Sequence, residues 1–135
     1  MATGKGQLST MHPVTGFKLG IASAGIKTPG RKDLLVMEIA EGSTAAGLFT
    51  QNAFCAAPVI VAKQHLASHT PKYLLVNTGN ANAGTGDQGI SDALQSCEAL
   101  AAATSASKEQ ILPFSTGVIG EPLPMDRLLS GIPAA

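Results

Sequence analysis

Short apolar runs separated by polar or glycine-containing segments are the first pattern along the chain. Two such runs, at 17–27 and 34–40, flank Thr28-Pro29-Gly30, and we predict that they pair as a hairpin across this turn. Two more short apolar runs, at 73–76 and 111–119, are also predicted to be strands. These four segments predict a sheet that begins with two antiparallel neighbours.

A helical pattern of apolar residues begins near position 90. The residues that repeat at i, i+3, i+4 and i+7 spacing, and so share one helix face, are Ile90, Ala93, Leu94, Cys97, Leu100 and Ala101. Asp87 and Asp92 lie near its start, where the positive end of the helix dipole favours acids. A shorter helix or turn is predicted at 126–131.

The apolar run at 54–62 contains a proline. Because Pro58 lacks the N–H that a central strand needs, we predict an edge strand here, or two pieces divided at the proline. Strands that alternate with one long helix predict an α/β or α+β fold with a sheet packed on helices. The length of 135 residues predicts a single domain over residues 1–135.

Composition narrows the possible partners. Nine basic residues balance nine acidic ones, so the chain lacks the electrostatic footprint of a nucleic-acid-binding protein. Ala and Gly fill 36 of the 135 positions, whereas the aromatic residues number only five and Trp is absent. Because bulky core residues are few, we expect the chain to pack against a partner surface.

The same sequence predicts a cytoplasmic protein that does not enter the membrane. Met1–Thr10 has no apolar stretch of the kind a secretory signal needs. The longest apolar run, at 56–62, is far shorter than the ~20 residues that span a bilayer. Cys55 and Cys97 form no Cys-x-x-Cys pattern, and we predict that both are reduced and buried.

Residues 84–89 match the pattern G-x-G-x-x-G, which is typical of dinucleotide-binding loops. In such loops the glycines follow the strand at once, but here seven residues, 77–83, intervene. The acid at a suitable distance, Glu109, precedes a strand instead of ending one. We therefore favour a polar loop whose Asn and Gly residues adopt positive φ. Nucleotide binding remains the less favoured alternative.

The segment 115–120 is a candidate for oxyanion binding. The hydroxyl of Thr116 and the backbone N–H of Gly117 are two donors that could point to one place, although a strand bulge relieved by glycine explains the same residues. No general base supports a nucleophile in this chain, because His12, His65 and His69 lie in polar segments and are predicted to be solvated. His65 and His69 lack a third ligand, so no metal site is predicted.

Several motifs resemble the ornithine acetyltransferase family, the bifunctional glutamate N-acetyltransferases. The similarity runs in one register from about Pro13 to the C-terminus. The segments that carry it are GFKLGIASAGIK at 16–27, FTQN at 49–52, AAPV at 56–59, NTGNANA at 77–83 with the helix that follows, and LPFSTGVIGEPLPM at 112–125. The resemblance implies an ornithine-acetyltransferase-like (DmpA/ornithine acetyltransferase type) fold.

The resemblance also implies a function. Members move an acetyl group from N-acetylornithine to glutamate in arginine biosynthesis, and some also use acetyl-CoA, with no other cofactor. Their precursor cleaves itself before a threonine, which becomes the N-terminal nucleophile of a β chain, and α and β chains assemble as an α2β2 heterotetramer. The Thr-Gly pair that forms the family's oxyanion hole matches Thr116 and Gly117.

This chain ends several dozen residues before the position where the family has its nucleophilic threonine. The resemblance therefore predicts the N-terminal part of an α chain, active only together with a β chain. A structural or interaction fragment without activity is the alternative.

Overall fold

The computed structural model describes residues 9–135. Residues 1–8 lie outside this described part. They make up most of Met1–Thr10, the segment from which we predict that the chain lacks a secretory signal. The elements, in chain order, are β1 (Phe17–Ala22), β2 (Leu34–Ile39), α1 (Ala57–Ser68), β3 (Tyr73–Asn80), α2 (Gly86–Ala103), η1 (Lys108–Gln110), β4 (Ile111–Val118), α3 (Met125–Gly131) and η2 (Ile132–Ala134).

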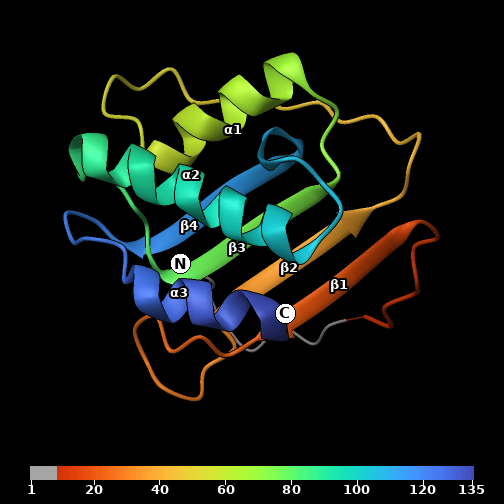
Figure 1. Ribbon diagram of the computed structural model, residues 1–135, viewed down its shortest axis with the longest axis horizontal. Coiled ribbons are helices and arrows are strands. Elements are labelled where there is room, and N and C mark those ends of the chain that lie inside the picture. Colours follow the sequence, from red (N-terminus) through yellow and green to blue (C-terminus); the bar gives the residue numbers. More distant parts are fainter. Residues whose placement is uncertain (1–8) are drawn as a thin grey trace.

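The four strands form one mixed sheet in the order β1-β2-β3-β4. The first two pairings are antiparallel, which confirms the predicted hairpin, and β3 pairs in parallel with β4 through the crossover that contains α2. Figure 1 shows α1, α2 and α3 on the same side of the sheet. The predicted α/β or α+β class, with a sheet packed on helices, is therefore confirmed.

The strand predicted at 54–62 is wrong, because this segment begins helix α1. Pro58 lies in the first turn of α1, where the missing N–H has no helical partner to lose. Ala57, Val61 and Ala62 are buried on one side of the helix. The apolar run thus reflects a buried helix face.

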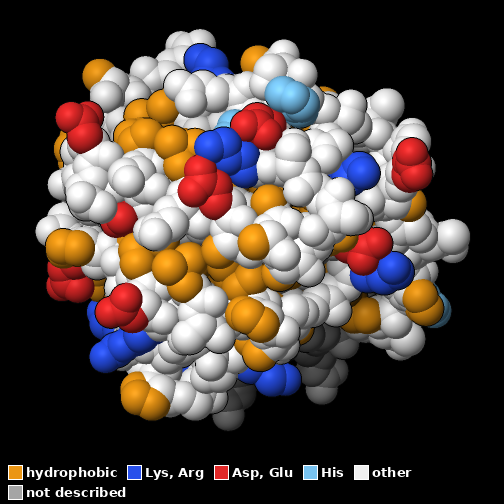
Figure 2. All heavy atoms as spheres, viewed as in Figure 1, with side chains coloured by type: hydrophobic (Ala, Val, Ile, Leu, Met, Phe, Trp, Pro, Cys, Tyr) orange, Lys and Arg blue, Asp and Glu red, His pale blue; other side chains and the backbone are white. Residues whose placement is uncertain are grey.

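The core lies between the sheet and the helices. Its sheet residues include Leu34, Val36, Leu75 and Ile111, and its helical residues include Cys97, Leu100, Leu128 and Ile132. Cys97 is fully buried as predicted, whereas Cys55 is only half-buried, and both are free thiols. Figure 2 shows the helix-covered side, where charged side chains are scattered and hydrophobic ones gather along α2 and α3.

The other side of the sheet is apolar and no described helix covers it (Figure 1). On β1, Leu19 and Ile21 are 58% and 51% exposed. Their register partners on β2, Met37 and Leu35, are half-buried. Strand alternation places all these side chains on the face opposite the core residues. Among residues 9–135, no helix is both long and apolar enough to cross a bilayer.

Candidate functional site

Thr116 and Gly117 lie near the carboxyl end of the edge strand β4. They pair with Thr78 and Gly79 of β3, and the register between the strands shifts at Gly79/Asn80. Asn80 is registered against both Thr116 and Val118, so the ladder is irregular here, as it is at a β-bulge. We call this irregular stretch the bulge. It lies at the two candidate residues, where a strand bulge is the structural explanation predicted from the sequence.

Gly117 adopts a backbone conformation that other residues rarely take. Its φ is +137°, and a Cβ at this position would lie 2.6 Å from the Asn80 nitrogen and still nearer to the carbonyl carbon of Gly79. Only glycine fits, because the backbones of β3 and β4 come into direct contact here. The peptide between Thr116 and Gly117 consequently has a fixed place at the end of the sheet.

The two neighbouring hydroxyls differ in their surroundings. Ser115 is half-buried, and its Oγ donates to Oδ1 of Asn77 at 2.6 Å. Thr116 is exposed, and none of the hydrogen bonds between described residues involves its hydroxyl. The Thr116 hydroxyl is thus available to an external group, whereas the Ser115 hydroxyl is committed to the protein.

Two buried asparagines hold the bulge from the β3 side. Nδ2 of Asn77 donates to the carbonyl of Asn80 at 2.9 Å, and Asn77 is 3% exposed. Nδ2 of Asn80 donates to the carbonyls of Glu121 and Pro122 at 3.1 and 3.0 Å. These bonds also explain why β3 extends to Asn80 instead of ending at Val76 as predicted, since the polar side chains are buried and paired.

Asn82 links the bulge to the start of α2. Its N–H donates to Oδ1 of Asn80 at 2.8 Å, and its Nδ2 donates to the carbonyl of Gly89 at 2.8 Å. Its Oδ1 accepts a hydrogen bond from the Thr85 hydroxyl. Asn82 has a φ of +46°, which asparagine tolerates better than most residues. The loop after β3 is therefore ordered by its own side chains.

Only the start of the G-x-G-x-x-G segment is the favoured polar loop, because helix α2 already begins at Gly86. Gly84 and Gly86 have positive φ, while Gly89 is buried inside α2 against Thr85 and Asn82. Asp87 is exposed in the first turn of α2, where a bound phosphate would meet a like charge. This geometry favours a structural role for the glycines over nucleotide binding.

The histidines are placed differently from one another. His65 is buried between α1 and β4, and its Nδ1–H donates to the Ile111 carbonyl at 2.8 Å, so its prediction as a solvated residue is wrong. The spacing of Val61 and His65 on the buried face of α1 is the signal that would have shown this. His12 and His69 are exposed as predicted. Within residues 9–135, no group of three His, Cys, Asp or Glu residues could hold a metal ion.

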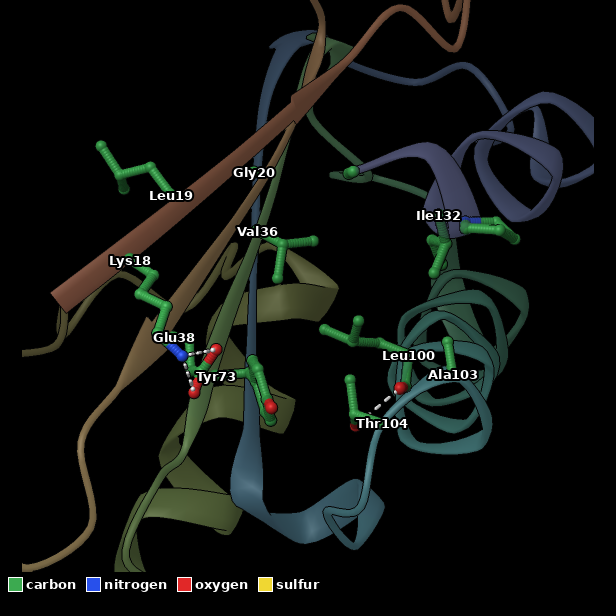
Figure 3. A pocket seen from close by; sticks show the side chains of 12 residues that line it. Lys18, Leu19, Gly20, Val36, Glu38, Tyr73, Leu100, Ala103, Thr104 and Ile132 are labelled. Atoms are coloured by element: carbon green, nitrogen blue, oxygen red, sulfur yellow. Dashed lines mark hydrogen bonds and ion pairs between the residues drawn. The ribbon is translucent and has the colours of Figure 1, made fainter. Parts of the chain in front are cut away.

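Two further features of the structure are the buried Cys97 thiol and a cavity at one end of the sheet. Burial, together with the nearby carboxylates of Glu98 and Glu109, raises the pKa of the Cys97 thiol to about 12, so this thiol stays protonated and unreactive. A cavity of about 310 Å³ lies at the other end of the sheet from Thr116 (Figure 3). The two charged groups in it, Lys18 and Glu38, pair with each other at 3.1 Å.

Comparison with known proteins reveals a clear family relationship. The sequence profile of the ArgJ family matches residues 18–135. The chain is 60% identical over 135 residues to the arginine biosynthesis bifunctional protein ArgJ of Pseudomonas syringae pv. tomato. This match covers 100% of the chain and 33% of that protein. It is 56% identical over 123 residues to the ArgJ of Methylococcus capsulatus, and this match covers 91% of the chain and 30% of that protein. The chain spans about a third of the length of these relatives.

Solved structures resemble the chain over most of its length. Ornithine acetyltransferase of Mycobacterium tuberculosis, complexed with ornithine, matches with a TM-score of 0.84 and 38% identity, covering 88% of this chain and 65% of that one. The ArgJ protein of Bacillus halodurans matches with a TM-score of 0.83 and 34% identity, covering 88% of this chain and 62% of that one. The fold is therefore of the ornithine acetyltransferase type.

Proposed function

The chain belongs to the ArgJ family, and on this basis we propose that it supplies the oxyanion hole of an acetyltransferase in arginine biosynthesis. In this proposal Thr116 donates through its hydroxyl and Gly117 through its backbone N–H. The exposed Thr116 hydroxyl beside the bulge is the observation that carries the proposal. Two donors in fixed positions stabilise negative charge that develops on a carbonyl oxygen.

The proposed reaction moves an acetyl group from N-acetylornithine to glutamate. The hydroxyl of a threonine at the start of a β chain attacks the acetyl carbonyl carbon, and its proton passes to the α-amine of the same threonine. The C–N bond then breaks, ornithine leaves as the amine after taking up a proton, and an acetyl-threonine ester remains. The amine of glutamate attacks this ester and frees the threonine. Both attacks place a negative charge on the oxygen that Thr116 and Gly117 would face.

The strand pattern supports the role of the Gly117 N–H. The carbonyl of Val118 accepts the N–H of Ala81, so Val118 is turned toward β3. Because successive backbone groups of a strand alternate in direction, we propose that the Gly117 N–H faces the open side of β4. Because β4 is an edge strand of the sheet, no other strand within residues 9–135 pairs with that side.

We propose that the chain works as part of a larger assembly. The apolar sheet face that includes Leu19 and Ile21 supports this, because faces of this kind mark contacts with other protein surfaces. The partner is the β chain of the same self-cleaving precursor, and the pair forms an α2β2 heterotetramer in the cytoplasm. Acetyl-CoA is a possible second acetyl donor and is a substrate, so no cofactor is part of the proposal.

The experiment is an acetyl transfer assay on the complete enzyme with Thr116→Ala. Removing one oxyanion donor should lower kcat by roughly 100- to 1,000-fold, while the chains stay associated. Thr44→Ala, which removes an exposed hydroxyl from a loop outside the sheet, is the matched control and should keep full turnover. If Thr116→Ala transfers acetyl groups as fast as the control, Thr116 has no part in the oxyanion hole.

A further inference from the structure

The side chains beneath the bulge form a network that the reaction itself does not require. We propose that Asn77 and Ser115 are positioning residues that hold Thr116 and Gly117 in place. This inference rests on the oxyanion hole proposed above. Asn77 is only 3% exposed, and the Ser115 hydroxyl already donates its hydrogen to Asn77. They act through the backbone that they hold.

Asn77 ties the two parallel strands together at the residue before Thr116. Its Oδ1 accepts the Ser115 hydroxyl at 2.6 Å, which fixes β4. Its Nδ2 donates to the Asn80 carbonyl at 2.9 Å, which fixes the irregular end of β3. One amide therefore bonds to both strands, on either side of the register shift.

Asn80 ties down the chain on the other side of the candidate pair. Its Nδ2 donates to the carbonyls of Glu121 and Pro122, and its Oδ1 accepts the N–H of Asn82. Thr116 and Gly117 are thus bracketed between two anchored points in the sequence. The first is Ser115, bonded to Asn77, and the second is the segment 121–122, bonded to Asn80.

This bracketing matters because Gly117 has little conformational preference of its own. Glycine adopts positive and negative φ with similar ease, so its φ of +137° is set by the surrounding contacts. Moving a hydrogen-bond donor by about 1 Å lowers the reaction rate roughly 100-fold, even when the substitution that moves it lies away from the reacting atoms. Loosening the network should therefore reduce catalysis more than substrate binding.

The test measures acetyl transfer by the complete enzyme carrying Asn77→Asp or Ser115→Ala. Asn77→Asp keeps the acceptor for Ser115 but loses the donor to Asn80, and Ser115→Ala loses only the bond to Asn77. Each should lower kcat by roughly 10- to 100-fold with KM nearly unchanged. The double variant loses both bonds, and its loss in kcat should be smaller than the product of the two single losses, because both bonds belong to one network. Ser115→Thr keeps the hydroxyl and should retain turnover.

Ser96→Ala is the matched control, since the buried Ser96 hydroxyl also donates a hydrogen bond within the protein, in this case to the backbone carbonyl of Asp92 in α2. It should lower thermal stability and leave kcat unchanged. If Asn77→Asp does not fold, Ser115→Ala tests the inference by itself, because Ser115 is only half-buried. An unchanged kcat in Ser115→Ala, or a loss no greater than in Ser96→Ala, overturns the inference while the transfer activity stands. No transfer by the unsubstituted enzyme overturns the proposed function and the inference with it.

Discussion

Gly117 shows how far a single residue is constrained by the contact between two strands. Gly117→Ala should destabilise the protein by at least about 3 kcal/mol, because the methyl group would overlap the β3 backbone and the φ of +137° is strained for alanine. Gly30→Ala is the control, since Gly30 also has positive φ but no atom in the described part of the chain lies within 4 Å of its Cβ position. It should cost about 1 kcal/mol.

Urea unfolding of the two glycine variants checks this prediction. The midpoint for Gly117→Ala should fall well below that for Gly30→Ala, with similar slopes. Equal midpoints would mean that the β3–β4 contact at Gly117 relaxes without loss, and the fixed position of the Thr116–Gly117 peptide would no longer follow from packing.

At the level of secondary structure, the sequence predicts the strands and helices whose pattern of apolar and turn residues is local. The hairpin of β1 and β2, the helix α2 and the strand β4 follow from apolar spacing and turn residues, and the structure contains all of them. The sequence pattern does not distinguish helix α1 from a strand, because a short apolar run has no distinct period and Pro58 fits a divided strand as well as the first turn of a helix. The candidate pair Thr116 and Gly117 was also visible in the sequence.

The hydrogen bonds around the candidate pair could not be predicted in the same way. Asn77 and Ser115 are 38 residues apart and meet only because β3 and β4 are neighbours in parallel. The residues 77–80 have the composition of a loop, so the sequence places them outside the sheet. Burial with full hydrogen bonding turns them into strand, and only the tertiary structure shows this.

The connection between β1 and β2 depends on one buried acid. The carboxylate of Asp33 accepts the N–H groups of Ala24 and Ile26 at 2.7 and 2.6 Å. In Asp33→Asn one of these N–H groups would face an NH₂ group, so the stability should fall by about 1–3 kcal/mol. Glu41→Gln, at an exposed turn position, should change it by less than about 0.5 kcal/mol.

Thermal and urea unfolding of the two acid variants distinguishes the outcomes. Hydrogen exchange in Asp33→Asn should also quicken at whichever of Ala24 and Ile26 faces the NH₂ group, because its N–H loses its acceptor. Wild-type stability together with unchanged exchange at these two amides would show that Asp33 does not order the connection.

For the molecule as a whole, the two sides of the sheet are unequal. Helices bury one side, whereas the other leaves Leu19 and Ile21 more than half exposed. Apolar faces of this kind associate with one another in water when no other surface covers them. The 135-residue chain on its own should therefore self-associate as its concentration rises, and the sheet should be the surface that associates.

Sedimentation equilibrium over a range of concentrations tests which surface is responsible. Leu19→Lys should weaken the association constant roughly tenfold or more, since burying one leucine contributes about 1.5–3 kcal/mol. Leu48→Lys makes the same change at a loop position that is fully exposed and outside the sheet, and should leave the constant unchanged. If both variants weaken association equally, general repulsion between like charges explains the effect. A chain that stays monomeric throughout would show that the exposed sheet face alone does not drive contact, and the proposed assembly would then have to depend on other surfaces.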